Sequence, residues 1–563
     1  MRKRPVVRCL LLLALLAPVT SALSAAAPLS SLAAAATSST ATRPPPQEFG
    51  SDWDDPRTAE PAITRPDGRV CKVEIVSHGF ADFSTYRRAY TPPADCAGPW
   101  HKVVLDLHGQ VQGRQYDRMG QIRIGGVTVL RTSTPEPSRD GIQWQVEKDI
   151  TAYAPLLTQV SSVEMELGNL VNETYTGIFQ IQATLSFYPA DADHPAALTA
   201  NSVQALSNAH RVGADLVGGF VIPSDTRQLV AEVYANGSGG GCEEFWYLTA
   251  PVEGYSCRSE HGPYRELQVL VDGKVAGLAA PYPHIYTGGW SNPFLWYAVP
   301  APQTFDLHPQ QFDLSPFIGL LNDGKPHELR VRVLGLAHDA EGWSLLPNLQ
   351  IWRDPQGRRV RAGLTRHVHA PAQLANPITA TSDGTRLTAT GSGQLSLAGW
   401  VEDSHGRREI EISYEVGMQS RHDWTHDENN DRLQVEWTDR RMSRSRAAGE
   451  PWQTREELLR FGLDGGIASV PVDGHPRLTT DLVIHVDDYR SQQDGAAPAR
   501  WTQLNNRFDG QASYTQEVPR EQRNAVGHSR QQVQMRDSEG QCQARRIETV
   551  NGAFVADSTG CQP

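Results

Sequence analysis

From about residue 60 onwards, hydrophobic residues alternate with polar ones or gather in short runs of strand length. Alternation with a period of two, and short apolar runs bounded by turn residues, predict β-strands. Glycine and proline separate the predicted strands about every ten residues, and few windows have helical periodicity. The clearest predicted strands are residues 103–107, 121–130, 178–188, 268–271, 328–334, 394–401 and 410–416. Short helices are predicted at 150–157, 203–210 and 312–321. The sequence therefore predicts an all-β protein.

The strand-rich part of the chain is too long for one core, and it divides into three β domains. Many short strands in succession favour antiparallel sandwiches such as jelly rolls. Breaks are predicted at 191–200 and at 353–375, the second being dense in Arg, Pro and His. The expected domains are residues 61–192, 193–360 and 361–563.

The N-terminus has the pattern of an export signal. Arg2, Lys3 and Arg4 precede an apolar run that ends near Ala17 and is followed by small residues. This predicts a signal peptide at 1–25, followed by a flexible leader rich in Ala, Ser, Thr and Pro at 26–60. No later segment approaches the length of a membrane span. We therefore expect a secreted or periplasmic monomer with no membrane attachment.

Charge and cysteine content limit the possible partners and the cellular compartment. The net charge of −12, without a basic run interleaved with aromatics, argues against nucleic acid as a partner. Outside the predicted signal peptide the chain has six cysteines, which suits an oxidising compartment. Six cysteines allow 15 pairings. In this chain, however, the six cysteines lie in three couples whose members are close in sequence. We predict the disulfides Cys71–Cys96, Cys242–Cys257 and Cys542–Cys561.

Two short motifs carry candidate chemistry. GRQYDR contains Asp117 beside Arg118, and CEEFWY contains Glu243 and Glu244 beside aromatic residues. Two carboxylates from separate segments suit hydrolysis, because one can move a proton while the other holds water or steadies charge. The alternative is that these acids are solvated ends of ordinary strands.

Other candidate features are less specific. The segment HDWTHDENND at 422–431 could resemble a zinc or calcium site, but it lacks the HExxH order and the glycine of a calcium loop. A polar hairpin loop is the expected structure there. Trp290 follows two glycines in a turn-like stretch, where an exposed ring could stack on a sugar. The other tryptophans of the second domain are expected mainly in its core.

Several longer motifs resemble the peptide-N-glycosidase A family, whose members cleave the amide between asparagine and the first N-acetylglucosamine of N-glycans. The resemblance covers roughly residues 70–353 and is not traceable beyond about 375. The motifs are GRQYDRMGQIRIGGVTVLRTSTPEP, GIQWQVEKDITAY, NLVNETYTGIFQI, EEFWY, GGWSNPFLWY, FDLSPFIGLLNDGKPHELRVRVLG and WSLLPNLQIW.

A more distant resemblance to peptide-N-glycosidase F implies two adjacent jelly-roll sandwiches with the site at their junction, here followed by a C-terminal β domain. It implies Asp117 and Glu244 as catalytic residues, with Glu244 preferred over Glu243. Arg118, Asn169, Trp246 and Trp290 are expected to bind substrate. A third acidic residue should fall near 167–171, where this chain has Gly168 and Asn169. Asn169, Glu166 or Glu173 could take its place.

The resemblance implies N-glycosylated peptides and glycoproteins as substrates, and aspartate plus a glycosylamine as products. No cofactor, metal, thiol or nucleotide is required for this chemistry. Two alternatives remain open: an endo-glycosidase, which also uses two carboxylates but cuts between sugars, and a glycan-binding protein that needs no acid pair.

Overall fold

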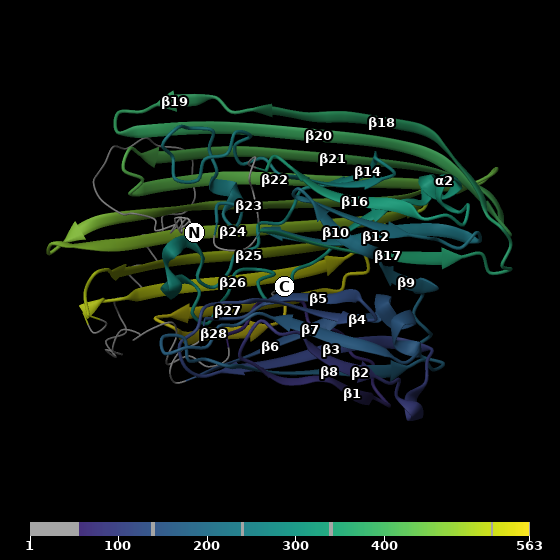
Figure 1. Ribbon diagram of the computed structural model, residues 1–563, viewed down its shortest axis with the longest axis horizontal. Helices are drawn as coiled ribbons and strands as arrows, with labels where there is room; N and C mark the ends of the chain where they lie inside the picture. The colour runs from purple at the N-terminus through teal and green to yellow at the C-terminus, as the bar shows by residue number, and fades with distance from the viewer. Residues whose placement is uncertain (1–55, 137–140, 238–240, 337–341, 520–521, 562–563) are drawn as a thin grey trace, which may run out of the picture.

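The computed structural model describes residues 56–136, 141–237, 241–336, 342–519 and 522–561. The predicted signal peptide at 1–25 and most of the predicted leader at 26–60 lie outside these residues. Within them, no helix is long and apolar enough to cross a membrane. The protein is all-β, as predicted, and consists of antiparallel sheets (Figure 1).

The first sandwich is an eight-stranded jelly roll, shown in purple and blue in Figure 1. Its two sheets have the strand orders β1-β8-β3-β6 and β2-β7-β4-β5. The first sheet consists of β1 (Cys71–Phe80), β8 (Phe179–Pro189), β3 (Trp100–Val111) and β6 (Ile142–Asp149). The second consists of β2 (Tyr86–Tyr90), β7 (Ser161–Leu167), β4 (Met119–Ile124) and β5 (Val127–Ser133).

The second sandwich repeats this topology with one added edge strand. One sheet has the order β15-β12-β17-β9, and the other has the order β10-β11-β16-β13-β14, in which β10 is the extra strand. The first of these consists of β15 (Gln310–Asp313), β12 (Thr226–Gly237), β17 (Trp343–Arg353) and β9 (Ser202–Ala205). The second consists of β10 (Ser207–Val212), β11 (Asp215–Phe220), β16 (His327–Leu334), β13 (Glu266–Val271) and β14 (Lys274–Ala279). The expectation of two adjacent jelly rolls is confirmed.

The C-terminal part is one antiparallel sheet of 11 strands, which runs as a meander from β18 to β28 across Figure 1. Several of its strands are 20 residues long. The strands are β18 (Arg361–Ala375), β19 (Ile378–Ala380), β20 (Gly384–Asp403), β21 (Gly406–Thr425), β22 (Asn430–Ala447), β23 (Gln453–Val472), β24 (His475–Asp494), β25 (Arg500–Thr515), β26 (Val526–Asp537), β27 (Cys542–Val550) and β28 (Ala553–Thr559).

One face of this long sheet is apolar and packs on the second jelly roll. Strand β22 alternates buried and exposed positions along its first half, as a strand with one covered face should. Its buried Trp437 contacts Trp246 of the second jelly roll with ring centroids 5.1 Å apart. A single hydrophobic core therefore contains residues of both units, whereas the first jelly roll has a core of its own.

The two jelly rolls are joined through strand β12, whose residues from Leu229 onwards are buried on both faces. Ala231 and Val233 face the core of the second jelly roll. Glu232 and Tyr234, on the opposite face of the strand, contact Tyr153 of the first jelly roll through their polar groups. The junction between the jelly rolls is thus hydrogen-bonded as well as packed.

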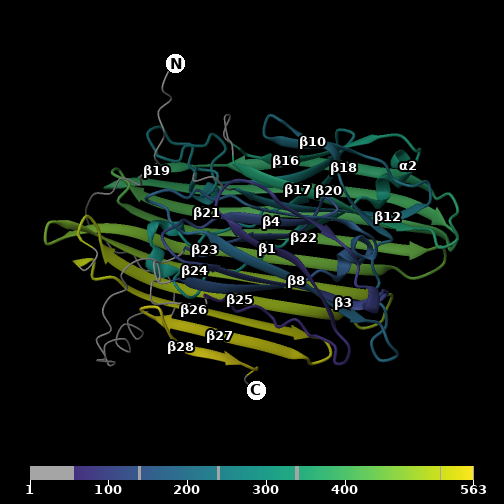
Figure 2. The same ribbon diagram turned by 60° about the horizontal axis from the view of Figure 1, so that its bottom comes forward.

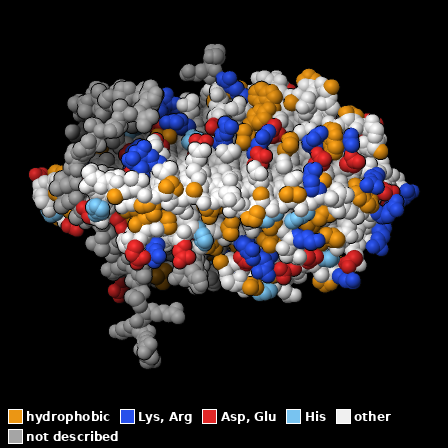
Figure 3. Space-filling view, turned by 90° about the horizontal axis from the view of Figure 1, so that it is seen from above, with side chains coloured by type: hydrophobic (Ala, Val, Ile, Leu, Met, Phe, Trp, Pro, Cys, Tyr) orange, Lys and Arg blue, Asp and Glu red, His pale blue; other side chains and the backbone are white. Residues whose placement is uncertain are grey.

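The N-terminal segment of the described chain also contacts the long sheet. The Ala59 N–H donates to Oε1 of Gln531 at 2.7 Å, and Arg57 pairs with Asp557 at 2.8 Å. Figure 2 shows β26, β27 and β28 at the border of the molecule where these contacts form. On the face in Figure 3, charged side chains of both signs are interspersed, so the net charge is not gathered there.

Two helix predictions are partly confirmed and one is wrong. A 3₁₀ helix forms at Thr151–Thr158, and short helical turns form at Ser315–Phe317 and in α2 (Ile318–Leu321). Residues 203–210 instead contribute to β9 and β10, because pairing with β17 and β11 supplies their hydrogen bonds. Backbone pairing here outweighs a weak local helical pattern.

All three predicted disulfides are confirmed: Cys71–Cys96, Cys242–Cys257 and Cys542–Cys561. The predicted hairpin at 422–431 is also confirmed, since β21 pairs with β22 around this segment. Its His422 bonds to Asp431 in the buried face of the hairpin.

Candidate active site

Asp117 lies at the junction of the two jelly rolls. It belongs to the loop between β3 and β4, so its backbone comes from the first jelly roll. Its Oδ2 accepts a hydrogen bond of 2.7 Å from the Gly288 N–H and one of 3.3 Å from the Thr287 hydroxyl. Both donors lie in the loop between β14 and β15 of the second jelly roll. The carboxyl group is therefore held by a loop 170 residues further along the chain.

The surroundings of Asp117 act on its pKa in opposite directions. Burial raises the pKa of this carboxyl above its usual value, because the charged form loses water. The donors at Gly288 and Thr287, together with the charge of Arg118, partly offset that rise. The net effect is a raised pKa in a group that still has donors directed at its ionised form, as expected of a proton-transfer group.

A second carboxyl group, absent from the sequence prediction, lies beside Asp117. Glu136 follows the end of β5 and is 9% exposed. Its N–H donates to the Thr287 hydroxyl at 3.0 Å, so one hydroxyl contacts both acidic residues. A Cβ atom placed on Gly288 would lie 2.6 Å from Glu136 Oε1 and 3.3 Å from Asp117 Oδ2. The two carboxyl groups therefore both lie against Gly288.

The sequence does contain a signal for Glu136. Strands β4 and β5 form a hairpin in which Met119 is paired with Ser133. The pairing continues beyond the strands, since the Arg118 N–H donates to the Thr134 hydroxyl at 2.9 Å. A hairpin predicted at the Gly125–Gly126 turn would have placed Glu136, which follows β5, beside Asp117, which precedes β4.

Arg118 supports the loop that carries Asp117. Its Nη2 donates to Oε1 of Gln115 at 2.7 Å, and Gln115 in turn donates to the Leu170 carbonyl at 3.0 Å. Burial lowers the pKa of Arg118, while the charge of Asp117 raises it. Arg118 therefore contributes a nearby positive charge.

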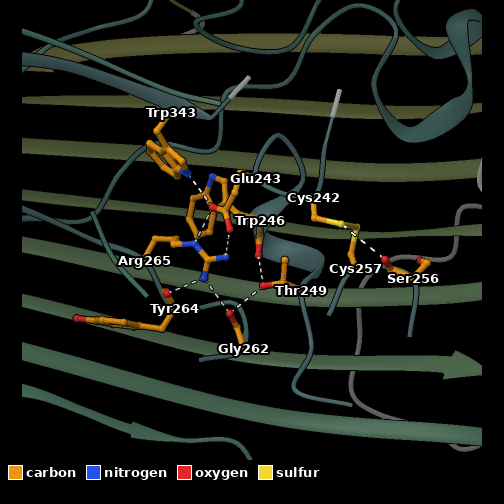
Figure 4. A network of polar contacts seen from close by, with 10 residues as sticks. All are labelled: Cys242, Glu243, Trp246, Thr249, Ser256, Cys257, Gly262, Tyr264, Arg265 and Trp343. Carbon is orange, nitrogen blue, oxygen red and sulfur yellow. Dashed lines mark hydrogen bonds and ion pairs between the residues drawn. A yellow bond between two sulfur atoms is a disulfide. The ribbon is translucent and has the colours of Figure 1, made fainter. Parts of the chain in front are cut away.

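The adjacent residues Glu243 and Glu244 have different surroundings, and Figure 4 shows those of Glu243. Glu243 is 4% exposed and forms a two-pronged ion pair with the buried Arg265, at 2.7 and 3.0 Å. Trp343 Nε1 donates to the same carboxylate at 2.7 Å. Every contact of Glu243 described here is therefore a structural one, which leaves Glu244 as the candidate for chemistry.

Glu244 is half-buried and lies in the turn after Cys242. Burial and the charge of Glu244 both raise the pKa of Tyr247. The Tyr247 ring stacks on Trp290, with centroids 6.2 Å apart and planes at 14°. Trp290 follows Gly288 by two residues, so this stack links the surroundings of Glu244 to the loop that holds Asp117.

Trp290 lies in a turn, as predicted, but its ring is only 4% exposed. Its φ is 57° and that of Ser291 is 52°, which places both in the left-handed region that few residues with a side chain adopt. Contacts with the long sheet accompany this conformation. Thr480 Oγ1 approaches the Trp290 carbonyl at 3.4 Å, and the Tyr514 hydroxyl approaches the Ser291 carbonyl at 3.4 Å. All three units of the protein thus meet at this loop.

The structure does not favour Trp246 or Asn169 as substrate contacts. Trp246 is 1% exposed and packs against Trp343 and Trp437. Asn169 is fully buried, and its amide donates to the backbone carbonyls of Phe80 and Gly177 at 2.9 and 3.0 Å. Neither side chain presents a free face to a sugar in this structure.

One group of acidic and histidine side chains in the described part of the chain could offer ligand atoms to a metal: Asp354, Asp403 and His405. Asp354 already accepts backbone N–H groups from Gln356, Arg358 and Ser404. These bonds stabilise the loop, and they do not point to a metal.

Comparison with known proteins matches the part of the chain that contains the two jelly rolls. The family model described as peptide N-acetyl-beta-D-glucosaminyl asparaginase amidase A matches residues 57–369, which include both jelly rolls. A protein of Prunus dulcis named peptide-N4-(N-acetyl-beta-glucosaminyl)asparagine amidase A is 33% identical over 386 residues. That alignment covers 61% of this chain and 65% of the Prunus dulcis protein, so it spans less than two thirds of the relative's length.

Two solved structures of PNGF-II, in space groups P21 and C2, also resemble this chain. The first has a TM-score of 0.34 at 14% identity and covers 51% of this chain and 66% of that one. The second has a TM-score of 0.31 at 13% identity and covers 55% and 64%.

Proposed function

The chain belongs to the peptide N-acetyl-beta-D-glucosaminyl asparaginase amidase A family, and we propose that it hydrolyses the amide bond between asparagine and the innermost N-acetylglucosamine of N-linked glycans. The observation that carries this proposal is the position of Asp117, held by Gly288 and Thr287 at the junction of two jelly rolls. N-glycosylated peptides and glycoproteins are the proposed substrates.

In the proposed reaction, water attacks the carbonyl carbon of the asparagine side chain. Asp117, ionised, takes a proton from the attacking water, since two donors already stabilise its carboxylate form. The carbon–nitrogen bond then breaks, and the leaving glycosylamine nitrogen takes up the proton that Asp117 removed from the water, which regenerates the carboxylate. The peptide retains aspartate, and the glycan leaves as a glycosylamine.

Glu244 has a positioning role in this proposal. It lies half-buried at the second motif and near the Tyr247–Trp290 stack, where it can accept hydrogen bonds from water or sugar hydroxyl groups. Arg118 supplies positive charge near Asp117 and favours its ionised form. Trp290 shapes the loop, and its ring is too enclosed to serve as an open sugar platform.

The test is mass spectrometry of a defined N-glycopeptide treated with the protein in ¹⁸O-water. Amide hydrolysis converts asparagine to aspartate with one ¹⁸O in its new carboxyl group. Residual N-acetylglucosamine on asparagine would instead show an endo-glycosidase, and an unchanged peptide would show a glycan-binding protein. Asp117→Asn serves as the matched inactive control, because it preserves shape and removes the ionisable group.

A further inference from the structure

The surroundings of Glu136 point to a role in addition to those proposed above for Asp117 and Glu244. Its side chain lies at the site and is 9% exposed, yet no described residue forms a hydrogen bond with its buried Oε2. A buried carboxylate without donors is costly, because the charge loses its hydration and gains nothing in return. A carboxylic acid that retains its proton avoids that cost.

The contrast with Asp117 indicates which of the two groups is ionised. Asp117 Oδ2 accepts the Gly288 N–H and the Thr287 hydroxyl, both of which stabilise a carboxylate. Glu136 contributes only its backbone N–H to Thr287, and its side chain has no such donors among the described residues. Two negative charges on either side of Gly288 would repel each other, so the pair is most stable with one proton.

We propose that Glu136 is the third carboxyl group of the site, a positioning residue that remains protonated so that Asp117 can ionise. This rests on the proposed function, and it replaces the expectation of an acidic residue near 167–171. Glu166, the acid closest to that stretch, is bonded to Gln121 at 2.7 Å and to Arg123.

The charged groups around the pair are consistent with this assignment. Burial and the charge of Asp117 raise the pKa of Glu136 well above its usual value, and Arg114 lowers it only in part. From the other elements, Tyr116 and Tyr514 face Glu136 and Arg118 faces Asp117. A hydrogen bond with Tyr175 and burial raise the pKa of Tyr116, and burial raises the pKa of Tyr514, so neither tyrosine carries a negative charge at neutral pH.

Two measurements on the full-length protein test the proposal. The first is infrared spectroscopy at neutral pH, where a protonated carboxyl group gives a C=O band distinct from that of a carboxylate. Glu136→Gln should remove such a band, and this readout does not depend on activity. Glu60→Gln is the positive control for the band, because burial raises the pKa of Glu60 to about 8 and this carboxyl group should also be protonated at neutral pH. It is the negative control for activity, because its charged neighbours are Asp306 and Arg545 and do not include Asp117.

The second measurement is the pH profile of kcat/KM on the glycopeptide. Loss of the Glu136 proton at high pH places a second negative charge beside Asp117, so the wild-type rate should fall there. Glu136→Gln cannot ionise, and it should extend activity by about one pH unit or more on the alkaline side. At lower pH its rate should remain within about threefold of wild type. Glu60→Gln should leave the profile unchanged.

Three results would overturn the proposal: no lost band in Glu136→Gln, an unchanged alkaline limb, or loss of activity at every pH in a folded variant. The last would show that Glu136 itself transfers a proton. If the wild type releases no glycan, the proposed function fails, while the infrared result still decides whether Glu136 is protonated.

Discussion

At the scale of single residues, Glu243 and Glu244 are neighbours in sequence, but substitution of Glu243 should reduce stability, whereas substitution of Glu244 should reduce activity. Removing the charge of Glu243 leaves Arg265 buried and unpaired, and breaking a buried pair typically costs about 3–5 kcal/mol. We therefore expect Glu243→Gln to lower the free energy of unfolding by about that amount. Glu244→Gln should lower the free energy of unfolding by less than Glu243→Gln does, but it should reduce kcat.

Urea denaturation and glycopeptide kinetics on both variants separate these effects. Equal destabilisation by the two substitutions, or a fully active Glu244→Gln, would show that the roles assigned to the two glutamates are incorrect.

Thr287 offers a second prediction at this scale, on pH dependence. Its hydroxyl donates to Asp117 at 3.3 Å and so favours the ionised carboxylate. Thr287→Val removes that donor and raises the pKa of Asp117. Since the proposed reaction needs the carboxylate, the acidic limb of the kcat/KM profile should move to higher pH. A hydrogen bond worth about 1 kcal/mol corresponds to a shift of about 0.7 pH unit.

The control for that shift is Thr480→Val. Thr480 contacts the same loop through the Trp290 carbonyl, but none of its described contacts involves Asp117. A shift of equal size in both variants would mean that general loosening of the loop, and not the hydrogen bond, moves the limb.

At the scale of elements, the loop between β14 and β15 positions the site, and Gly288 is its tightest point. An alanine Cβ there would lie 2.6 Å from Glu136 Oε1 and 3.3 Å from Asp117 Oδ2, so one carboxyl group must move. We expect Gly288→Ala to lower kcat about a hundredfold, as misplacement of a reacting group does. Gly417→Ala, whose Cβ would meet only Thr438 at 4.0 Å, should have no effect on kcat.

The elements themselves were largely predictable, because alternation and Gly or Pro breaks are local properties of the sequence. Residues 203–210 were not, since their pairing with β17 and β11 is set by distant strands. The candidate site was likewise predictable only where it depends on local sequence. Asp117 was suggested by its motif, but its contact with Gly288 spans 171 residues and forms only when the jelly rolls pack. Glu136 required the register of the β4–β5 hairpin, which turns within residues 121–130, where the alternation predicts a single strand.

At the scale of the whole molecule, the long C-terminal sheet completes the core beneath the second jelly roll. Trp296 of that jelly roll stacks on Phe508 of β25 with centroids 5.0 Å apart, and Trp246 packs on Trp437 of β22. Both tryptophans are 1% exposed in the intact protein. Without the sheet both tryptophans would lose these contacts, as would the other core residues that pack on it.

A chain truncated after residue 360 should therefore fail to fold cooperatively, even though it retains both jelly rolls and the proposed carboxyl groups. Exposing a fully buried large apolar side chain typically costs about 1.5–3 kcal/mol, and several such residues together reach the usual stability of a domain. The measurement is near-ultraviolet circular dichroism during thermal unfolding, with a fragment of residues 67–205 as the control. That fragment contains the separate core of the first jelly roll except Phe305, together with the Cys71–Cys96 disulfide, and it should show a sigmoidal transition. A sharp transition in the longer truncated chain would show that the second jelly roll folds without the sheet, and that the shared core is an interface between two independent domains.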